Sequence, residues 1–129
     1  MTQHIGAVAL VVPDYDAAIA FYCDTLGFSL TADEDQGGGK RWVLVTPPGA
    51  SETRLLLAQA KGADQEAAIG NQIGGRVFLF LHTDDFDADH ARMQAAGVTF
   101  EEAPRTEPYG KVAVFCDPFV NRWDLLQLF

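Results

Sequence analysis

The sequence predicts an α+β protein built from two βαβββ repeats, and three observations lead to this prediction. Apolar runs rich in β-branched residues alternate with segments of helical spacing, as where Ala7–Val12 is followed by residues 14–27. The same order of elements returns about 71 residues later, where Phe86-Asp87-Ala88-Asp89 matches Tyr15-Asp16-Ala17-Ala18. The chain has 129 residues and is 48% hydrophobic, which suits one globular domain with its own core.

The first repeat, about residues 5–60, begins with the strand Ala7–Val12, which ends at Pro13. Asp14 is a typical N-cap for the following helix, because its carboxylate can accept a hydrogen bond from a free backbone N–H. Gly27 predicts the end of that helix. Strands are expected next at residues 28–32, 41–45 and 53–58, separated by turns at Gly37–Gly39 and Pro47–Gly49.

The second repeat, about residues 76–129, follows the same order. A strand at Val77–Leu81 precedes a helix that begins at Asp84 or Asp85 and ends at Gly97. Strands are then expected at residues 98–101, 111–116 and 123–129. The polar, glycine-containing segment 61–75 links the two repeats. It is either a plain tether or a flap over a pocket, since long loops in compact domains are often functional.

Composition excludes several classes of function. Eighteen acidic against nine basic side chains give a net charge of −9, which disfavours nucleic-acid binding because phosphate contacts need clustered Lys and Arg. No apolar run reaches the ~20 residues of a membrane span, and the first residues lack a basic signal-peptide region. The two cysteines, Cys23 and Cys116, suit a reducing compartment. A cytoplasmic protein without nucleic-acid or membrane partners is therefore expected.

Several short motifs carry a family resemblance. They are Val12-Pro13-Asp14, Ala18-Ile19-x-Phe21-Tyr22, Leu26-Gly27-Phe28 and Asp117-Pro118-x-x-Asn121-x-Trp123-Asp124-Leu125. With the paired repeat, they make the chain similar to the vicinal oxygen chelate superfamily, which includes glyoxalase I, extradiol dioxygenases and bleomycin resistance proteins. The resemblance implies one glyoxalase-like domain over residues 1–129, whose curled mixed sheet encloses a cleft with the helices outside. It also implies a homodimer.

The closing motif departs from the family pattern at one position. Val120 stands where the pattern usually has Gly. A β-branched residue resists the positive φ that such a turn favours. We expect a turn that is either rebuilt around Asn121 or strained.

The resemblance also implies metal-ligand positions, two in each repeat. They fall at Ala7, Leu56, Phe78 and Asp124. Only Asp124 can donate to a metal, and a metal site needs several N or O donors that converge. The expectation is therefore no metal and no other cofactor. The alternative left open is a divalent metal held by an atypical set that includes Asp124 and, in one version, His82.

Strand alternation predicts which side chains share the cleft face with these positions. Apolar walls with a few polar groups are typical of small-molecule sites. The repeat also aligns Arg41 and Val43 with Val112 and Val114 on that face, and it leaves Trp42 and Trp123 against the helices. The predicted ligand-binding residues are Ala7, Arg41, Leu56, Phe78, Phe80, His82, Arg122 and Asp124.

Each polar candidate has two interpretations. Asp124 is either the partner of Arg122 or another cation in a structural ion pair, or a carboxylate whose pKa is raised by apolar surroundings so that it can exchange a proton. Arg41 either binds an anionic substrate in bidentate fashion or lies on an exposed sheet face. His82 either lies in the pocket or is solvated at a strand end.

The function favoured by the sequence is that of a small-molecule-binding protein of the bleomycin-resistance type, which sequesters its ligand unchanged. The net negative charge favours a cationic ligand, whereas Arg41 and Arg122 in the cleft favour an anionic one. Two enzymes remain as alternatives. One is a glyoxalase-like lyase, isomerase or dioxygenase with an atypical metal site. The other is a metal-free acid/base enzyme in which Asp124 is the catalytic base.

Overall fold

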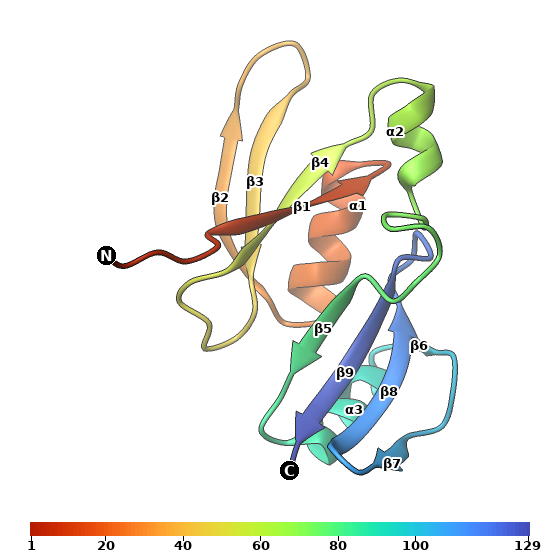
Figure 1. Ribbon diagram of the computed structural model, residues 1–129. Coiled ribbons are helices and arrows are strands. Elements are labelled where there is room, and N and C mark those ends of the chain that lie inside the picture. Colours follow the sequence, from red (N-terminus) through yellow and green to blue (C-terminus); the bar gives the residue numbers. More distant parts are fainter. The chain divides into compact units, whose positions relative to one another are not determined.

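A mixed α+β fold, as predicted, is seen in the computed structural model, which describes all residues 1–129 (Figure 1). The chain divides into two units, Met1–Ile69 and Gly70–Phe129. Each unit holds one β-sheet, of four strands in the first and five in the second. No helix has the length and apolar character that a membrane span requires.

The sheet of the first unit has the strand order β1-β4-β3-β2. β1 (Ala7–Val12) pairs in parallel with β4 (Arg54–Gln59), and β3 (Arg41–Thr46) pairs antiparallel with both β4 and β2 (Ser29–Asp35). The turn between β2 and β3 uses three consecutive glycines at φ of 83°, 64° and 83°. Glycine adopts this left-handed region without the steric cost of a Cβ, so the turn can reverse the chain tightly.

One face of this sheet is covered by α1 (Tyr15–Ile19), which continues as the π-helical segment η1 (Ala20–Thr25). Asp14 caps the helix as predicted, its Oδ2 accepting from the Ala17 amide at 2.8 Å, and Gly27 ends it at a φ of 85°. Alternate residues of the strands face the helix and are fully buried there. They include Leu10, Val43, Val45 and Leu57, with Tyr22 from the helix.

The segment 61–75, expected to be a tether or a flap, is partly helical. It contains α2 (Ala63–Ala68), which the sequence did not predict. After the helix, the Gly70 amide and Gln72 Nε2 donate to Asn121 Oδ1 at 2.8 and 3.0 Å. The start of the second unit is therefore held to its own closing turn.

The sheet of the second unit has the order β5-β9-β8-β6, and β7 also pairs with β8. β5 (Leu79–His82) is parallel to β9 (Arg122–Leu128), which is antiparallel to β8 (Gly110–Cys116). Two short strands, β6 (Thr99–Phe100) and β7 (Arg105–Glu107), lie along β8. The second half of the chain therefore repeats the connectivity of the first, as predicted.

Aromatic rings fill the space between this sheet and α3 (Phe86–Ala95), whose N-cap is Asp85. The ring of Phe115 stacks on Trp123 with 5.7 Å between centroids, and Phe100 lies between Phe115 and His90. His90 also stacks on Phe86. Trp123 is therefore on the helix side, as the sequence predicts.

The closing turn is the strained one of the two alternatives that the sequence left open. Val120 has a φ of 68°, which is a strained conformation for a β-branched residue. Around it the buried side chains of Asp117 and Asn121 bond to each other, and Asp117 Oδ1 accepts from the amides of Phe119 and Asn121 at 2.9 Å. The turn is thus strained at Val120 and held by the Asp117–Asn121 pair.

Candidate ligand-binding site

The face of the first sheet opposite α1 carries two of the predicted site residues. Ala9 pairs with Leu56, and Leu56 pairs with Leu44 on the other side. Because side chains alternate along each strand, Ala7, Ala9 and Leu56 share this face, in agreement with the predicted arrangement. Their role in binding stays a prediction.

Trp42 also belongs to this face, which corrects the prediction that it packs against the helices. It lies two residues from Leu44 on β3, and its side chain remains 38% exposed. Residues 42–45 are apolar at every position, so hydrophobicity alone does not indicate which face of β3 is buried. Pairing with β4 decides this, since Val43 lies opposite Leu57 in the core.

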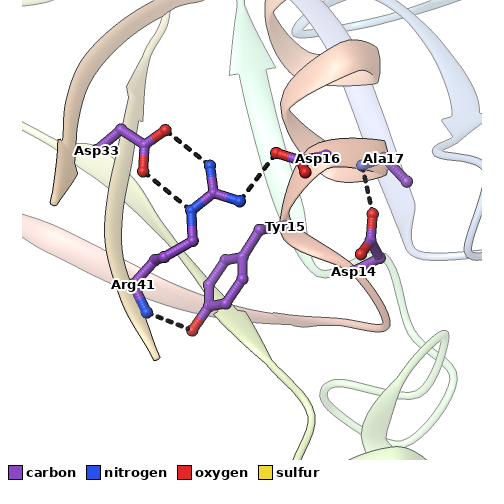
Figure 2. A network of polar contacts seen from close by, with 6 residues as sticks. All are labelled: Asp14, Tyr15, Asp16, Ala17, Asp33 and Arg41. Atoms are coloured by element: carbon purple, nitrogen blue, oxygen red, sulfur yellow. Dashed lines mark hydrogen bonds and ion pairs between the residues drawn. The ribbon is translucent and has the colours of Figure 1, made fainter. Parts of the chain in front are cut away.

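Arg41 and Val43 were predicted on the cleft face, and the structure shows that this is wrong. Arg41 lies on the α1 side, where it binds Asp33 with Nε to Oδ1 at 3.0 Å and Nη2 to Oδ2 at 2.7 Å (Figure 2). Its Nη1 bonds Asp16 of α1 at 2.8 Å, and its backbone amide donates to the Tyr15 hydroxyl at 3.1 Å. The guanidinium therefore stabilises the first unit, and its charge is matched by two carboxylates.

The error comes from a one-residue change in the repeat. Ala9 with Leu56 corresponds to Phe80 with Asp124, but Asp124 pairs with Val114 whereas Leu56 pairs with Leu44. In β3 and β8 the matching positions are therefore 44 and 114, not 43 and 114. A slip of one residue moves every side chain of a strand to the opposite face.

A hollow of about 580 Å³ lies in the first unit, at the carboxyl end of β4 and beside the glycine turn. This volume is within the range of small-molecule sites. Trp42, Leu56 and Ala58 give it apolar walls from the sheet face described above. Its polar lining residues come from the turn, the end of β4, the segment that follows β4, and α2, and include Lys40, Gln59, Lys61 and Gln65.

Most of the residues that line this hollow were not predicted from the sequence. Only Arg41 and Leu56 among its lining residues were predicted, and Arg41 was predicted on the wrong face. The lysines and Gln65 lie outside the repeated strands, on the hairpin turn and the linker. The signal available was the position of Gly37–Gly39 directly before Lys40-Arg41-Trp42, because a glycine turn exposes the residues that follow it.

In the second unit, the remaining predicted residues share the sheet face opposite α3. Asp124 lies between Phe80 on β5 and Val114 on β8, and Leu126 lies between His82 and Val112. Phe78 and Arg122 follow from alternation on the same strands. Phe80 is 57% exposed. The predicted set for this unit is therefore assembled on one face, and its role in ligand binding stays a prediction.

Asp124 has no ion-pair partner in the structure, which distinguishes its two interpretations. Arg122 instead bonds Glu101, with Nε to Oε2 at 2.8 Å, and donates to the Gly75 carbonyl. Asp124 Oδ1 is buried without a hydrogen-bond partner. Burial, opposed in part by the positive charge of Arg105, raises the pKa of this carboxyl above its usual value. Asp124 is thus able to hold a proton more readily than an ordinary aspartate.

Other reactive side chains do not form a catalytic group within either unit. Burial and the neighbouring Glu101 raise the pKa of the Cys116 thiol to about 11, and burial also raises that of Cys23. Thiols of high pKa are poor nucleophiles, because the thiolate is the reactive form. Within each unit, no three His, Cys, Asp or Glu side chains are gathered so as to hold a metal ion.

The family of the protein follows from this fold and from a sequence match. Residues 4–125 match the profile of the Glyoxalase/Bleomycin resistance protein/Dioxygenase superfamily, and the chain belongs to this family. A protein of Shewanella frigidimarina (strain NCIMB 400), described only as uncharacterised, is 54% identical over 129 residues, which cover 99% of this chain and 96% of the relative.

Two further relatives have descriptive names. The crystal structure of TnmS3, an antibiotic binding protein from Streptomyces sp. CB03234, superposes with a TM-score of 0.80 at 35% identity, covering 99% of this chain and 98% of TnmS3. An ethylmalonyl-CoA/methylmalonyl-CoA epimerase of Cereibacter sphaeroides is 29% identical over 122 residues, which cover 92% of this chain and 90% of the epimerase. The family thus contains both binding proteins and enzymes.

Proposed function

We propose that this protein binds a small organic molecule reversibly and releases it unchanged, as an antibiotic-binding protein does. The observation that carries the proposal is the place of Leu56. By family resemblance this is a metal-ligand position, and here it forms an apolar wall of the 580 Å³ hollow beside Trp42. A site in which a hydrocarbon side chain stands where the family has a metal-binding side chain is suited to holding an organic molecule.

The donor set supports the same proposal. By the family resemblance, three of the four metal positions fall at Ala7, Leu56 and Phe78, whose side chains have no N or O donor. These residues do not fit the metal site of the family's enzymes, since a single carboxylate is not a metal site. Similarity to the antibiotic binding protein TnmS3 over nearly the whole chain agrees with a binding role.

Ligand screening followed by chemical analysis tests the proposal. Purified protein is screened by thermal shift against a library of aromatic natural products, and each hit is measured by calorimetry. Hits are then incubated with the protein and recovered for mass spectrometry. We expect at least one ligand bound with micromolar affinity or better, recovered unchanged, and weakened at least tenfold by Trp42→Ala. Conversion of the ligand into a product would overturn the proposal.

Metal content is a separate test. The protein is offered Ni, Zn, Mn and Fe(II), desalted, and analysed for bound metal. We expect no metal to remain and no change in ligand affinity after chelation. One metal ion per chain would instead favour the lyase, isomerase or dioxygenase alternative with an atypical site.

A second candidate is a metal-free acid/base enzyme, favoured by the unpartnered, buried Oδ1 of Asp124 and its raised pKa. Similarity to the epimerase is consistent with proton-transfer chemistry in this family. Deuterium exchange separates this candidate from the first. A base would exchange an acidic C–H of a bound thioester or keto acid with D₂O, and Asp124→Asn would abolish the exchange while leaving the fold intact.

We also infer that the protein is a cytoplasmic homodimer, as the family resemblance implies. Exposed strand edges favour pairing between copies of a chain. Sedimentation equilibrium measures the mass in solution, and a mass of one chain across micromolar concentrations would contradict the dimer. Fractionation of cells that express the protein tests the location.

A further inference from the structure

We propose that the hollow of the first unit selects an aromatic ligand that carries an anionic group. This inference rests on the proposed binding function and names the ligand class. It differs from the simplest expectation for a chain of net charge −9, which would attract cations at long range. The local arrangement of charges carries the argument.

No acidic side chain lines the hollow, although acidic residues outnumber basic ones two to one in the chain. Three of the nine basic residues line it, namely Lys40, Arg41 and Lys61. Gln65 of α2 also lines it, whereas its acidic neighbours Asp64 and Glu66 do not. The charged residues of the lining are therefore all basic, and the carboxylates of Asp16 and Asp33, which bond Arg41, are not part of it.

The two lysines are the charges available to a ligand. Arg41 is held by Asp16 and Asp33, so its charge is matched (Figure 2). Lys40 and Lys61 form no ion pair, whereas five of the nine basic residues do. Two unmatched ammonium groups at one hollow offer an anion charge-assisted hydrogen bonds that the acidic surface elsewhere does not.

Trp42 provides the contact for the aromatic part of the ligand. Its indole is partly exposed at the wall of the hollow, next to Leu56 and Ala58. An aromatic ring laid against an exposed indole gains apolar contact and ring stacking. A planar aromatic molecule that places its ring on Trp42 and its anionic group toward Lys40 and Lys61 would use all three features together.

A matched pair of fluorescent probes tests this class. 1-Anilinonaphthalene-8-sulfonate and N-phenyl-1-naphthylamine share the same aromatic skeleton, and only the first carries a sulfonate. Each probe is titrated into the wild-type protein, Trp42→Ala, and the double variant Lys40→Gln/Lys61→Gln. The control is Arg54→Gln, which removes one positive charge at the opposite end of β4, where Arg54 forms no ion pair and bonds only backbone carbonyls.

We expect the sulfonate probe to bind about tenfold more tightly than the neutral one, with one molecule per chain. The double lysine variant should lose about tenfold in sulfonate affinity and change the neutral probe less than about twofold. Trp42→Ala should weaken both probes, and Arg54→Gln should affect neither. Sulfonate affinity should fall as salt rises.

Two results would overturn the anionic class while leaving the proposed binding function intact. One is an equal affinity of the wild-type protein for both probes, together with loss of binding of both probes in Trp42→Ala. The other is a sulfonate affinity that the lysine substitutions do not change. Failure of both probes to bind would also overturn the inference, and the library screen would still test the proposed function separately.

Discussion

Asn121 Nδ2 donates to Asp117 Oδ2 at 2.8 Å across the turn in which Val120 has a φ of 68°. The two residues flank the strained position, and both are at least 95% buried. Asn121 Oδ1 also accepts from Gly70 and Gln72. This pair therefore holds a turn that the local sequence alone would not favour.

Replacing Val120 by Gly should stabilise the protein. Relief of a left-handed conformation is worth roughly 1–3 kcal/mol for a residue with a side chain, and the entropy cost of glycine removes about 0.5–1 kcal/mol of that gain. Val120 is 63% exposed, so little packing is lost. We expect a net gain of about 1 kcal/mol in the free energy of unfolding, measured by urea denaturation.

The control for this prediction is Val120→Ala, which keeps a Cβ at the same backbone conformation. It should recover less than half of the gain seen for glycine. An equal gain in both variants would show that the Val120 conformation does not strain the turn.

Asn121→Ala should destabilise the second unit strongly. The change leaves the buried Asp117 carboxylate without one donor and leaves the Gly70 amide without its acceptor. Loss of partners by buried polar groups costs about 1–3 kcal/mol each, so we expect a loss of at least 2 kcal/mol in urea denaturation. Gln72→Ala removes the half-exposed Nε2 donor to Asn121 Oδ1 and should cost less than about 1 kcal/mol.

The strands common to both repeats, the helix caps and the repeat could be predicted because they depend on local chemistry, whereas the short strand β7 was not predicted. Asp14 and Asp85 accept from amides of the first helical turn, and Gly27 and Gly97 end helices at positive φ. The faces of β1, β4, β5 and β9 also follow from alternation, since these strands contain the paired positions of the two repeats.

The faces of β3 and the nature of the hollow could not be predicted, for a different reason. They depend on which residue of β4 lies opposite which residue of β3, and Val43 opposite Leu57 turns Trp42 outward. The apolar run 42–45 is compatible with both registers. Lys61 and Gln65 reach the hollow because residues 63–68 form α2, and this short polar helix has no apolar periodicity to indicate it.

The contact of Arg41 with Asp33 should be visible in the titration of that carboxyl group. The Arg41 guanidinium bonds both Asp33 oxygens and holds the pKa of Asp33 below its usual value. In Arg41→Gln we expect this pKa to rise toward the ordinary value of about 4, as measured by carboxyl-carbon NMR. Lys40→Gln is the matched control, because Lys40 is the neighbouring cation and forms no ion pair, and should leave the titration unchanged.

This contact also predicts the sign of a pH effect. A carboxyl whose pKa is lower in the folded protein stabilises it above the unfolded pKa, and this contribution is lost as the pH falls through the folded value. Wild-type protein should therefore lose more stability than Arg41→Gln on acidification below about pH 4. Parallel urea denaturation of the two proteins at pH 7 and pH 3 measures the difference, and an equal loss in both would contradict it.

The contribution of Asp124 to stability should depend on pH in the opposite sense to that of Asp33, and Asp124→Asn tests this. Burial raises the pKa of Asp124, so the folded protein binds this proton more tightly than the unfolded chain does. Its favourable contribution is therefore fully present below the ordinary carboxyl pKa of about 4 and is lost as the pH rises through the folded value.

At pH 7 the wild-type protein carries a buried carboxylate whose Oδ1 has no partner, and the amide variant avoids that charge. We expect Asp124→Asn to raise Tm at pH 7 to 8 and to lose this advantage as the pH falls below about 4, with Glu52→Gln as an exposed control that changes Tm little at either pH. A lower Tm for Asp124→Asn at pH 7 would show that the carboxylate is instead stabilised in the folded state.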